Sequence, residues 1–152
     1  MYVVGDNSVT VRRHGVWQRG PAPPGVASFD ATLGFSGGNA VIYAISSADV
    51  FVSRDGGASW DKALLPGSQP ELSGIAASGQ HGEVAYLGFA RLGTVGQSIF
   101  GVAKTRDAGR SWTLVWKETP ANAAANVHDI WLTQRFGLGW HTHESCCDVE
   151  RS

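Results

Sequence analysis

Two aspartates in nearly identical surroundings are the first candidates for chemistry in this sequence. Each lies in an octapeptide of the pattern Ser/Thr-Arg-Asp-x-Gly-x-Ser-Trp, and the copies are 52 residues apart: Ser53-Arg54-Asp55-Gly56-Gly57-Ala58-Ser59-Trp60 and Thr105-Arg106-Asp107-Ala108-Gly109-Arg110-Ser111-Trp112. A carboxylate can act as a general acid or base, or bind a hard cation such as Ca²⁺. The repetition argues against both roles, because an active site needs one constellation, whereas a structural device recurs in every repeat unit.

The residue types of the octapeptide fit a locked hairpin. The carboxylates of Asp55 and Asp107 can accept hydrogen bonds from turn N–H groups, and Gly57 and Gly109 can adopt positive φ. The tryptophans can each remove about 150–250 Å² from water between neighbouring units. The predicted structural set is Ser53, Asp55, Gly57, Ser59, Trp60, Thr105, Asp107, Gly109, Ser111 and Trp112.

Strand-like segments flank both octapeptides and predict two four-stranded units. The predicted strands are Val26–Phe35, Ala40–Ser46, Asp49–Arg54 and Ser59–Leu65, then Leu72–Ser78, Glu83–Arg91, Ser98–Thr105 and Ser111–Lys117. Residues 2–20 would supply outer strands of a preceding unit, where Val9–Trp17 is a fainter copy without the Asp, and residues 127–133 would begin a following unit. Units of about 40–50 residues are typical of β-propeller blades.

The two octapeptides resemble the Asp-box, or BNR repeat, of bacterial sialidases, xyloglucan-degrading propeller enzymes and sortilin-type receptors. The resemblance covers residues 2 to 133, and the stretch 129–140 also resembles segments that join blades in large bacterial Asp-box proteins. It implies an all-β fold, a partial β-propeller of about three four-stranded antiparallel blades with Asp-box hairpins between third and fourth strands. In these families the boxes lie opposite the ligand site, so we expect Arg54 and Arg106 to be solvated.

The opposite face would carry the second-to-third loops and the connections between blades. These segments are 19–25, 66–71, 91–97 and 118–126, and the candidate ligand-face residues are Asp30, Arg91, Gln97, His128 and Asp129. The Phe/Tyr-Arg-Ile-Pro signature of sialidases is absent from the sequence. Hydrolysis of other glycosides needs two carboxylates across a cleft. No local pattern singles out two of the Asp and Glu residues for this role, so we assign no catalytic residue.

Composition narrows the classes of partner. The 152 residues carry a net charge of -1, from 12 basic and 13 acidic residues without a basic stripe, which argues against nucleic acid. No stretch reaches the roughly 18 apolar residues of a membrane helix. No long segment keeps the 3.6-residue apolar period of a helix either, and Ala121–Ala125 is the only segment that could suggest one.

The C-terminal residues 141–152 are expected to form an irregular tail. They contain His, Glu, Asp and the neighbours Cys146 and Cys147, whose Cα atoms, about 3.8 Å apart, are too close for an ordinary disulfide. The spacing matches no zinc framework, so we predict neither a metal site nor a cofactor.

The expected function is that of an Asp-box propeller module with a structural or binding role, with neighbouring blades as partners and a glycan or protein as ligand. The alternative is a fragment of a sialidase-like or xyloglucanase-like glycoside hydrolase; a third hypothesis is an assembly-factor propeller. About three blades cannot close a ring, so we expect a longer parent protein, secreted or periplasmic, or ring completion by self-association.

Overall fold

The computed structural model describes residues 2–5, 8–13, 15–26, 29–67, 70–92, 99–118, 127–133 and 137–142. Within these ranges the chain folds into thirteen strands and contains no helix. Accordingly, this part of the chain contains no helix with the length and apolar character needed to cross a membrane. The tempting helix at Ala121–Ala125 lies outside the described residues.

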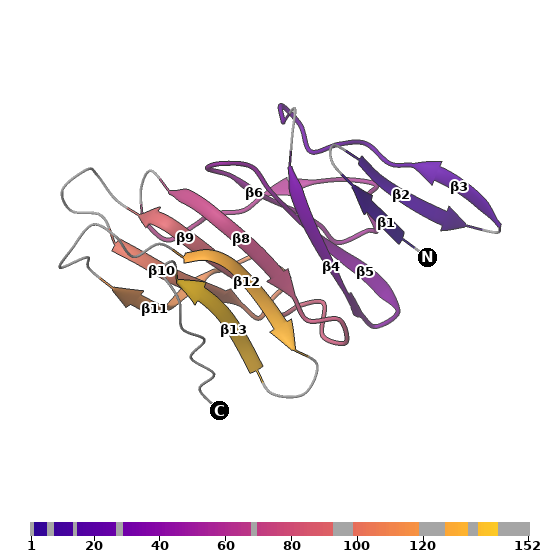
Figure 1. Cartoon of the computed structure of the whole chain (residues 1–152). Coiled ribbons are helices and arrows are strands. Elements are labelled where there is room, and N and C mark those ends of the chain that lie inside the picture. The colour runs from indigo at the N-terminus through magenta and orange to yellow at the C-terminus, as the bar shows by residue number, and fades with distance from the viewer. Residues whose placement is uncertain are drawn as a thin grey trace.

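The strands form four antiparallel sheets that follow one another along the chain (Figure 1). The first sheet contains β1 (Tyr2–Gly5), β2 (Ser8–Arg13) and β3 (Val16–Arg19). The second contains β4 (Asp30–Ser36), β5 (Asn39–Ile45), β6 (Val50–Ser53) and β7 (Asp61–Lys62). The third contains β8 (Glu71–Ala77), β9 (Ala85–Leu92), β10 (Ile99–Thr105) and β11 (Thr113–Glu118), and the fourth β12 (Val127–Thr133) and β13 (Gly137–Thr142).

The all-β antiparallel architecture and the two four-stranded units are as predicted, and the strand bounds differ most at β4, β7 and β13. β4 begins at Asp30 rather than Val26. β7 is confined to Asp61–Lys62, because Ser59 still belongs to the hairpin and bonds Asp55. β13 reaches Thr142, so the first two residues of the predicted irregular tail are in a strand.

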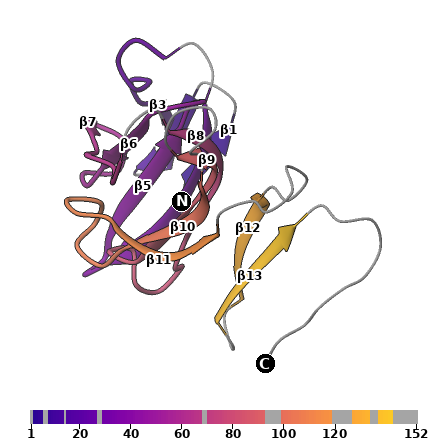
Figure 2. The ribbon, with the colours of Figure 1, turned by 90° about the vertical axis from the view of Figure 1, so that its left-hand side faces the viewer.

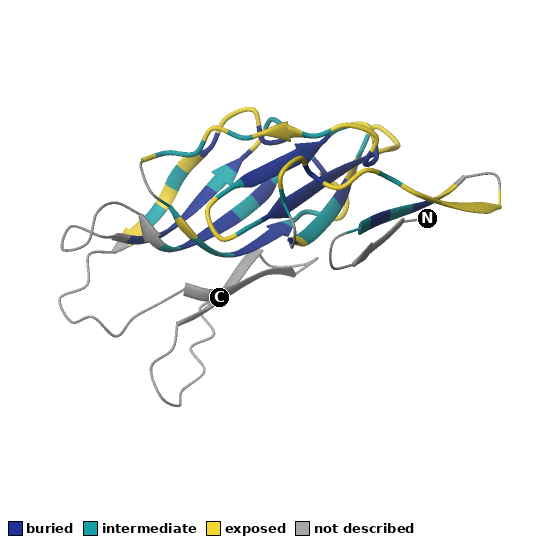
Figure 3. Ribbon diagram, turned by 90° about the horizontal axis from the view of Figure 1, so that it is seen from above, coloured by how far each residue is buried: buried dark blue, intermediate teal, exposed yellow. Residues whose placement is uncertain are grey.

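The second sheet is buried on both faces at its centre, which explains the nearly continuous apolar sequence of β5. Side chains alternate across a strand, so Ala40 and Ile42 pack with β2 of the first sheet, while Val41 and Tyr43 pack with the third sheet. Figure 3 shows this burial along the central strands. The core is therefore shared between sheets rather than contained in any one of them.

The first strands of successive sheets, β4, β8 and β12, lie side by side, and the hairpin β12–β13 flanks the third sheet (Figures 1 and 2). The turn between β8 and β9 reaches back to β4: Gly82 N donates to Phe35 O at 2.9 Å, and Phe35 N to Gly79 O at 3.2 Å. A Cβ on Gly34 would stand only 2.0 Å from Ser78 O, so this junction requires glycine.

Candidate functional site

The first motif hairpin closes around the carboxylate of Asp55. Oδ1 accepts hydrogen bonds from Ser53 Oγ (2.8 Å), Ala58 N (3.0 Å) and Ser59 N (2.9 Å). Oδ2 accepts one from Ser59 Oγ at 2.6 Å. Ser53 Oγ in turn accepts from Gly57 N at 2.7 Å. Both oxygens of the carboxylate are thus occupied by the hairpin's own donors.

The second hairpin repeats this arrangement around Asp107. Oδ1 accepts from Thr105 Oγ1 (2.8 Å) and Ser111 N (2.9 Å), and Oδ2 accepts from Ser111 Oγ at 2.5 Å. Gly109 N donates to Thr105 Oγ1 at 2.9 Å. Serine and threonine are therefore interchangeable at the first position of the motif, because the hydroxyl is what the hairpin uses.

These hydrogen bonds stabilise the charged form of both aspartates. Partial burial acts to raise the pKa of Asp55, but the bonds from Ser59, Ser53 and Ala58 outweigh it and lower the pKa to about 2. For Asp107 the side-chain bond from Ser111 is the largest cause, and the pKa again falls to about 2 against the opposing effect of burial. A general acid at neutral pH needs a raised pKa, so neither group suits that role.

The glycine of each hairpin packs on the sheet that precedes it in sequence. Gly57 has φ +89°, and a Cβ there would meet Val9 Cγ1 of β2 at 3.1 Å. Gly109 has φ +74°, and a Cβ there would stand 2.6 Å from Val52 Cγ2 of β6. The same hairpin position therefore makes the same contact between sheets twice.

The two tryptophans also pack between elements, although they differ in polar contacts. Trp60 Nε1 donates to Pro21 O at 2.9 Å, and its ring centroid lies 6.3 Å from that of Phe29. Trp112 is 8% exposed and meets Tyr43 edge-on at 6.2 Å. Its buried Nε1 has no acceptor among the described residues.

The expectation that both motif arginines are solvated is wrong for Arg54. Its Nη1 pairs with Asp61 Oδ2 at 2.7 Å, and its Nε donates at 2.8 Å to the carbonyl oxygen of Ala108 in the second hairpin. Arg106, the equivalent residue, is exposed. The sequence could not reveal this difference, because the acceptor lies in the following repeat.

The fainter upstream copy lacks the aspartate and forms a different hairpin. β2 and β3 pair directly up to Arg13 and Val16. Trp17 is 45% exposed, with the Arg12 guanidinium 5.9 Å from its ring centroid. The strands of this hairpin therefore pair closer to the turn than β10 and β11 do, and its tryptophan is more exposed than Trp112.

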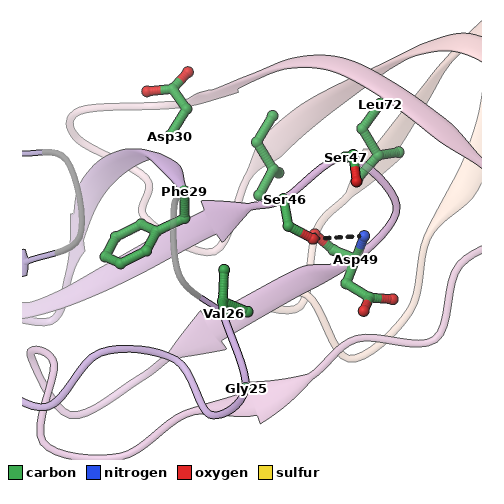
Figure 4. A pocket seen from close by; sticks show the side chains of 9 residues that line it. Gly25, Val26, Phe29, Asp30, Ser46, Ser47, Asp49 and Leu72 are labelled. Carbon is green, nitrogen blue, oxygen red and sulfur yellow. Dashed lines mark hydrogen bonds between the residues drawn. The ribbon is translucent and has the colours of Figure 1, made fainter.

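A hollow of about 630 Å³ lies at the other end of the second sheet from its motif hairpin. One wall is the segment that leads into β4, the other is the turn between β5 and β6, and β8 contributes one residue (Figure 4). The lining residues are Gly25, Val26, Phe29, Asp30, Ile45, Ser46, Ser47, Asp49 and Leu72. Since β6 runs from this turn to the motif, hollow and hairpin lie at opposite ends of one strand.

Two carboxylates line the hollow, and they differ in their partners. Asp49 Oδ1 pairs with Lys62 Nζ at 2.8 Å. Asp30 is exposed, and its Oδ1 accepts a hydrogen bond from Ala31 N at 2.8 Å. In Figure 4 the two carboxylates point away from each other, so they do not form the facing pair that glycoside hydrolysis requires.

The remaining candidate residues are placed only in part. Arg91 is in β9 opposite Glu71 of β8, and His128 and Asp129 are in β12 beside β8; their side chains are outside the described part of the structure. Gln97 lies outside the described residues altogether. Of the five candidates, only Asp30 is seen lining the hollow. Over the described ranges, no three His, Cys, Asp or Glu residues come together to hold a metal ion.

No protein-family profile matches the chain, and no curated protein matches it.

Proposed function

We propose that this chain is a segment of an Asp-box β-propeller that serves as a structural and ligand-binding module rather than as a catalyst. One observation carries the proposal. In both motifs the hairpin's own donors occupy both oxygens of the aspartate, and the motif glycine packs on the preceding sheet. A device that locks a hairpin and joins neighbouring units has a structural purpose at every occurrence.

The arrangement of the sheets supports the propeller. Two antiparallel sheets have four strands in sequence order, and the first strands of the last three sheets lie side by side. The turn between β8 and β9 ties the third sheet to the second, as it would tie blade to blade. In this proposal β1–β3 are the outer strands of one blade and β12–β13 begin another, within a larger protein.

The binding role rests on the hollow at the end opposite the hairpins. It combines hydroxyl groups, carboxylates and an apolar floor, a composition suited to a polar ligand such as a glycan or a protein segment. A hydrolase is less favoured, because Asp49 is committed to Lys62 and the carboxylate of Asp30 points away from it.

Two measurements test this proposal. A partial ring exposes sheet flanks, so light scattering after size-exclusion chromatography should show self-association of the 152-residue chain. Soaking or co-crystallisation with glycans should place ligand in the hollow and leave the hairpins empty. A compact monomer that melts cooperatively would contradict the partial propeller, and a ligand bound directly to Asp55 or Asp107 would contradict the structural role of the hairpins.

A further inference from the structure

We propose that the third sheet carries a docking site for a further motif hairpin, which another repeat of the same kind would contribute. The docking site consists of Tyr86 and Lys104, on the face that is turned away from the second sheet, and Arg106 at the hairpin end of that sheet. The inference deepens the proposed function and rests on it, because it names the partner that the module receives on this side.

Two pairs of equivalent residues locate the docking site. Val52 directly precedes the first motif and pairs across the second sheet with Tyr43. Lys104 directly precedes the second motif and pairs in the same way with Tyr86. Tyr43 and Val52 belong to the core that the second sheet shares with the third. Tyr86 packs with Val102 on the other face of the third sheet, and Lys104 Nζ lies 4.6 Å from its ring centroid.

On the second sheet, the equivalent position is covered by the next motif hairpin. A Cβ on Gly109 would stand 2.6 Å from Val52 Cγ2 and 3.4 Å from Tyr43 Cε1. The ring of Trp112 meets Tyr43 edge-on, and Tyr43 and Val52 are both fully buried. Gly57 packs on β2 of the first sheet in the same way. Both motif hairpins therefore cover the next-to-last strand of the sheet that precedes them.

The inner strands of the third sheet are covered in the same manner as those of the second. β12 lies against β8 and β9, as β8 lies against β4 and β5. Tyr86 and Lys104 are half-buried, whereas their equivalents in the second sheet are buried. The sequence contains two copies of the motif, and both hairpins already pack on earlier sheets. The third sheet therefore needs a hairpin from a further repeat, since a second copy of the folded chain has no free one.

Arg106 provides independent evidence for the same partner. Its equivalent, Arg54, donates at 2.8 Å to the carbonyl oxygen of Ala108 in the following motif hairpin. Arg106 is exposed and makes no hydrogen bond or ion pair with the described residues. A hairpin packed on Tyr86 and Lys104 would bring the corresponding carbonyl oxygen within reach of this guanidinium group.

Lysine in place of valine gives this docking site a charge that the second sheet lacks. Lys104 Nζ donates to Tyr86 Oη, which places the ammonium group beside the ring that a docked tryptophan would meet. Cations are attracted to the face of an indole ring. We therefore expect the tryptophan of the docked hairpin to contact Lys104 as well as Tyr86.

Saturation-transfer NMR on the full chain tests the docking site, because the method tolerates weak binding and self-association. The probe is a cyclised peptide that carries the second motif, Thr-Arg-Asp-Ala-Gly-Arg-Ser-Trp. Its control has alanine in place of the aspartate and so lacks the bonds that close the loop. The tryptophan and glycine protons of the probe should be saturated most strongly, and the control should bind about 3–10-fold more weakly.

Variants of the chain locate the binding. Arg106→Met should weaken binding of the probe by about 3–10-fold, the net value of one hydrogen bond. Arg110→Met is the matched control, because Arg110 is also exposed and donates to Asp107 O within its own hairpin. Lys104→Glu should weaken binding at least as much, whereas the same charge change at the exposed Lys117 of β11 should leave it unchanged. Circular dichroism should show that all four variants remain folded.

Failure of the probe to bind, equal binding of both peptides, or binding that neither Arg106→Met nor Lys104→Glu weakens would overturn the docking site. If the probe does not bind and Lys104→Glu dissociates a self-associated chain, a second copy occupies this face and the inference is wrong. These results would leave the proposed function standing, because the hairpin bonds of Asp55 and Asp107 do not depend on them. A ligand bound directly to Asp55 or Asp107 would overturn the proposed function instead.

Discussion

The two motif hairpins share one internal hydrogen-bond pattern but differ in what surrounds them. In the first, Asp55 and Ser59 are exposed, and the residue after the aspartate is Gly56, with φ +72°. In the second, the same position is Ala108, which adopts φ +56° and is 7% exposed. An alanine accepts this backbone conformation because the bonds to Asp107 and Thr105 impose it.

Ala108 also shows how the second hairpin is tied to its neighbours. Its N–H donates to Glu83 O at 3.0 Å, and its carbonyl accepts from Arg54 of the first hairpin. The motif thus determines the shape of the hairpin, whereas the contacts with neighbouring sheets differ between the two copies.

The largest loss of unfolding free energy is expected when the motif glycines are replaced. Gly109→Ala combines positive φ with a Cβ 2.6 Å from Val52, and it should cost about 2–5 kcal/mol of unfolding free energy. Gly57→Ala, with its contact at 3.1 Å, should cost about 1–3 kcal/mol. Urea unfolding measures both; equal losses would mean that the neighbouring strand does not decide the cost.

Removing the carboxylates should have a smaller effect. Asp107→Ala and Asp55→Ala leave hairpin donors unpaired and should each cost about 1–3 kcal/mol. Asp107→Ala should cost more, because Ala108 adopts positive φ within the loop that the bonds to Asp107 close. The same unfolding measurement decides the order, and a more harmful Asp55→Ala would contradict it.

Acid should weaken both hairpins in a defined window. Folding lowers the pKa of Asp55 and Asp107 from 3.8 to about 2. The contribution of the two carboxylates to the free energy of unfolding is therefore complete above about pH 4 and is lost as the pH falls towards 2. Thermal melts between pH 7 and 2 should show the decline. The double variant Asp55→Asn/Asp107→Asn should show a flatter pH profile, and an unchanged profile would mean that other groups control acid unfolding.

Replacing the two motif arginines should change the free energy of unfolding by different and smaller amounts. Arg54→Met removes the bonds to Ala108 O and Asp61 and should cost about 1–2 kcal/mol, since the side chain is only partly exposed. Arg106→Met should change stability by less than about 0.5 kcal/mol. If both variants behave alike, the bond between hairpins contributes nothing measurable.

The smallest changes in unfolding free energy should come from replacing the residue that follows each motif aspartate. Gly56→Ala imposes positive φ on an alanine and should cost about 1 kcal/mol. Ala108→Gly relieves that strain but loses a buried methyl group and makes the unfolded chain more flexible, so the net change should stay within about 0.5 kcal/mol. A loss above 1 kcal/mol would show that the methyl contact outweighs the strain.

The sequence by itself determined the local parts of this protein. The alternation and spacing of apolar residues predicted the all-β architecture, and the four-stranded units followed from the two motifs. The turn contacts of Asp55 and Asp107 were predictable as well, because every donor lies within four residues of its acceptor. Such contacts depend on residue types and spacing alone.

Only the tertiary structure decided which equivalent residues act differently. Arg54 and Arg106 occupy the same motif position, but the acceptor that distinguishes them is 54 residues from Arg54 in the chain. Asp30 became a lining residue because the turn at Ser46–Asp49 and Leu72 of the next sheet come to lie around it. Contacts between sheets join residues far apart in sequence, and a local pattern carries no information about which distant partner will be present.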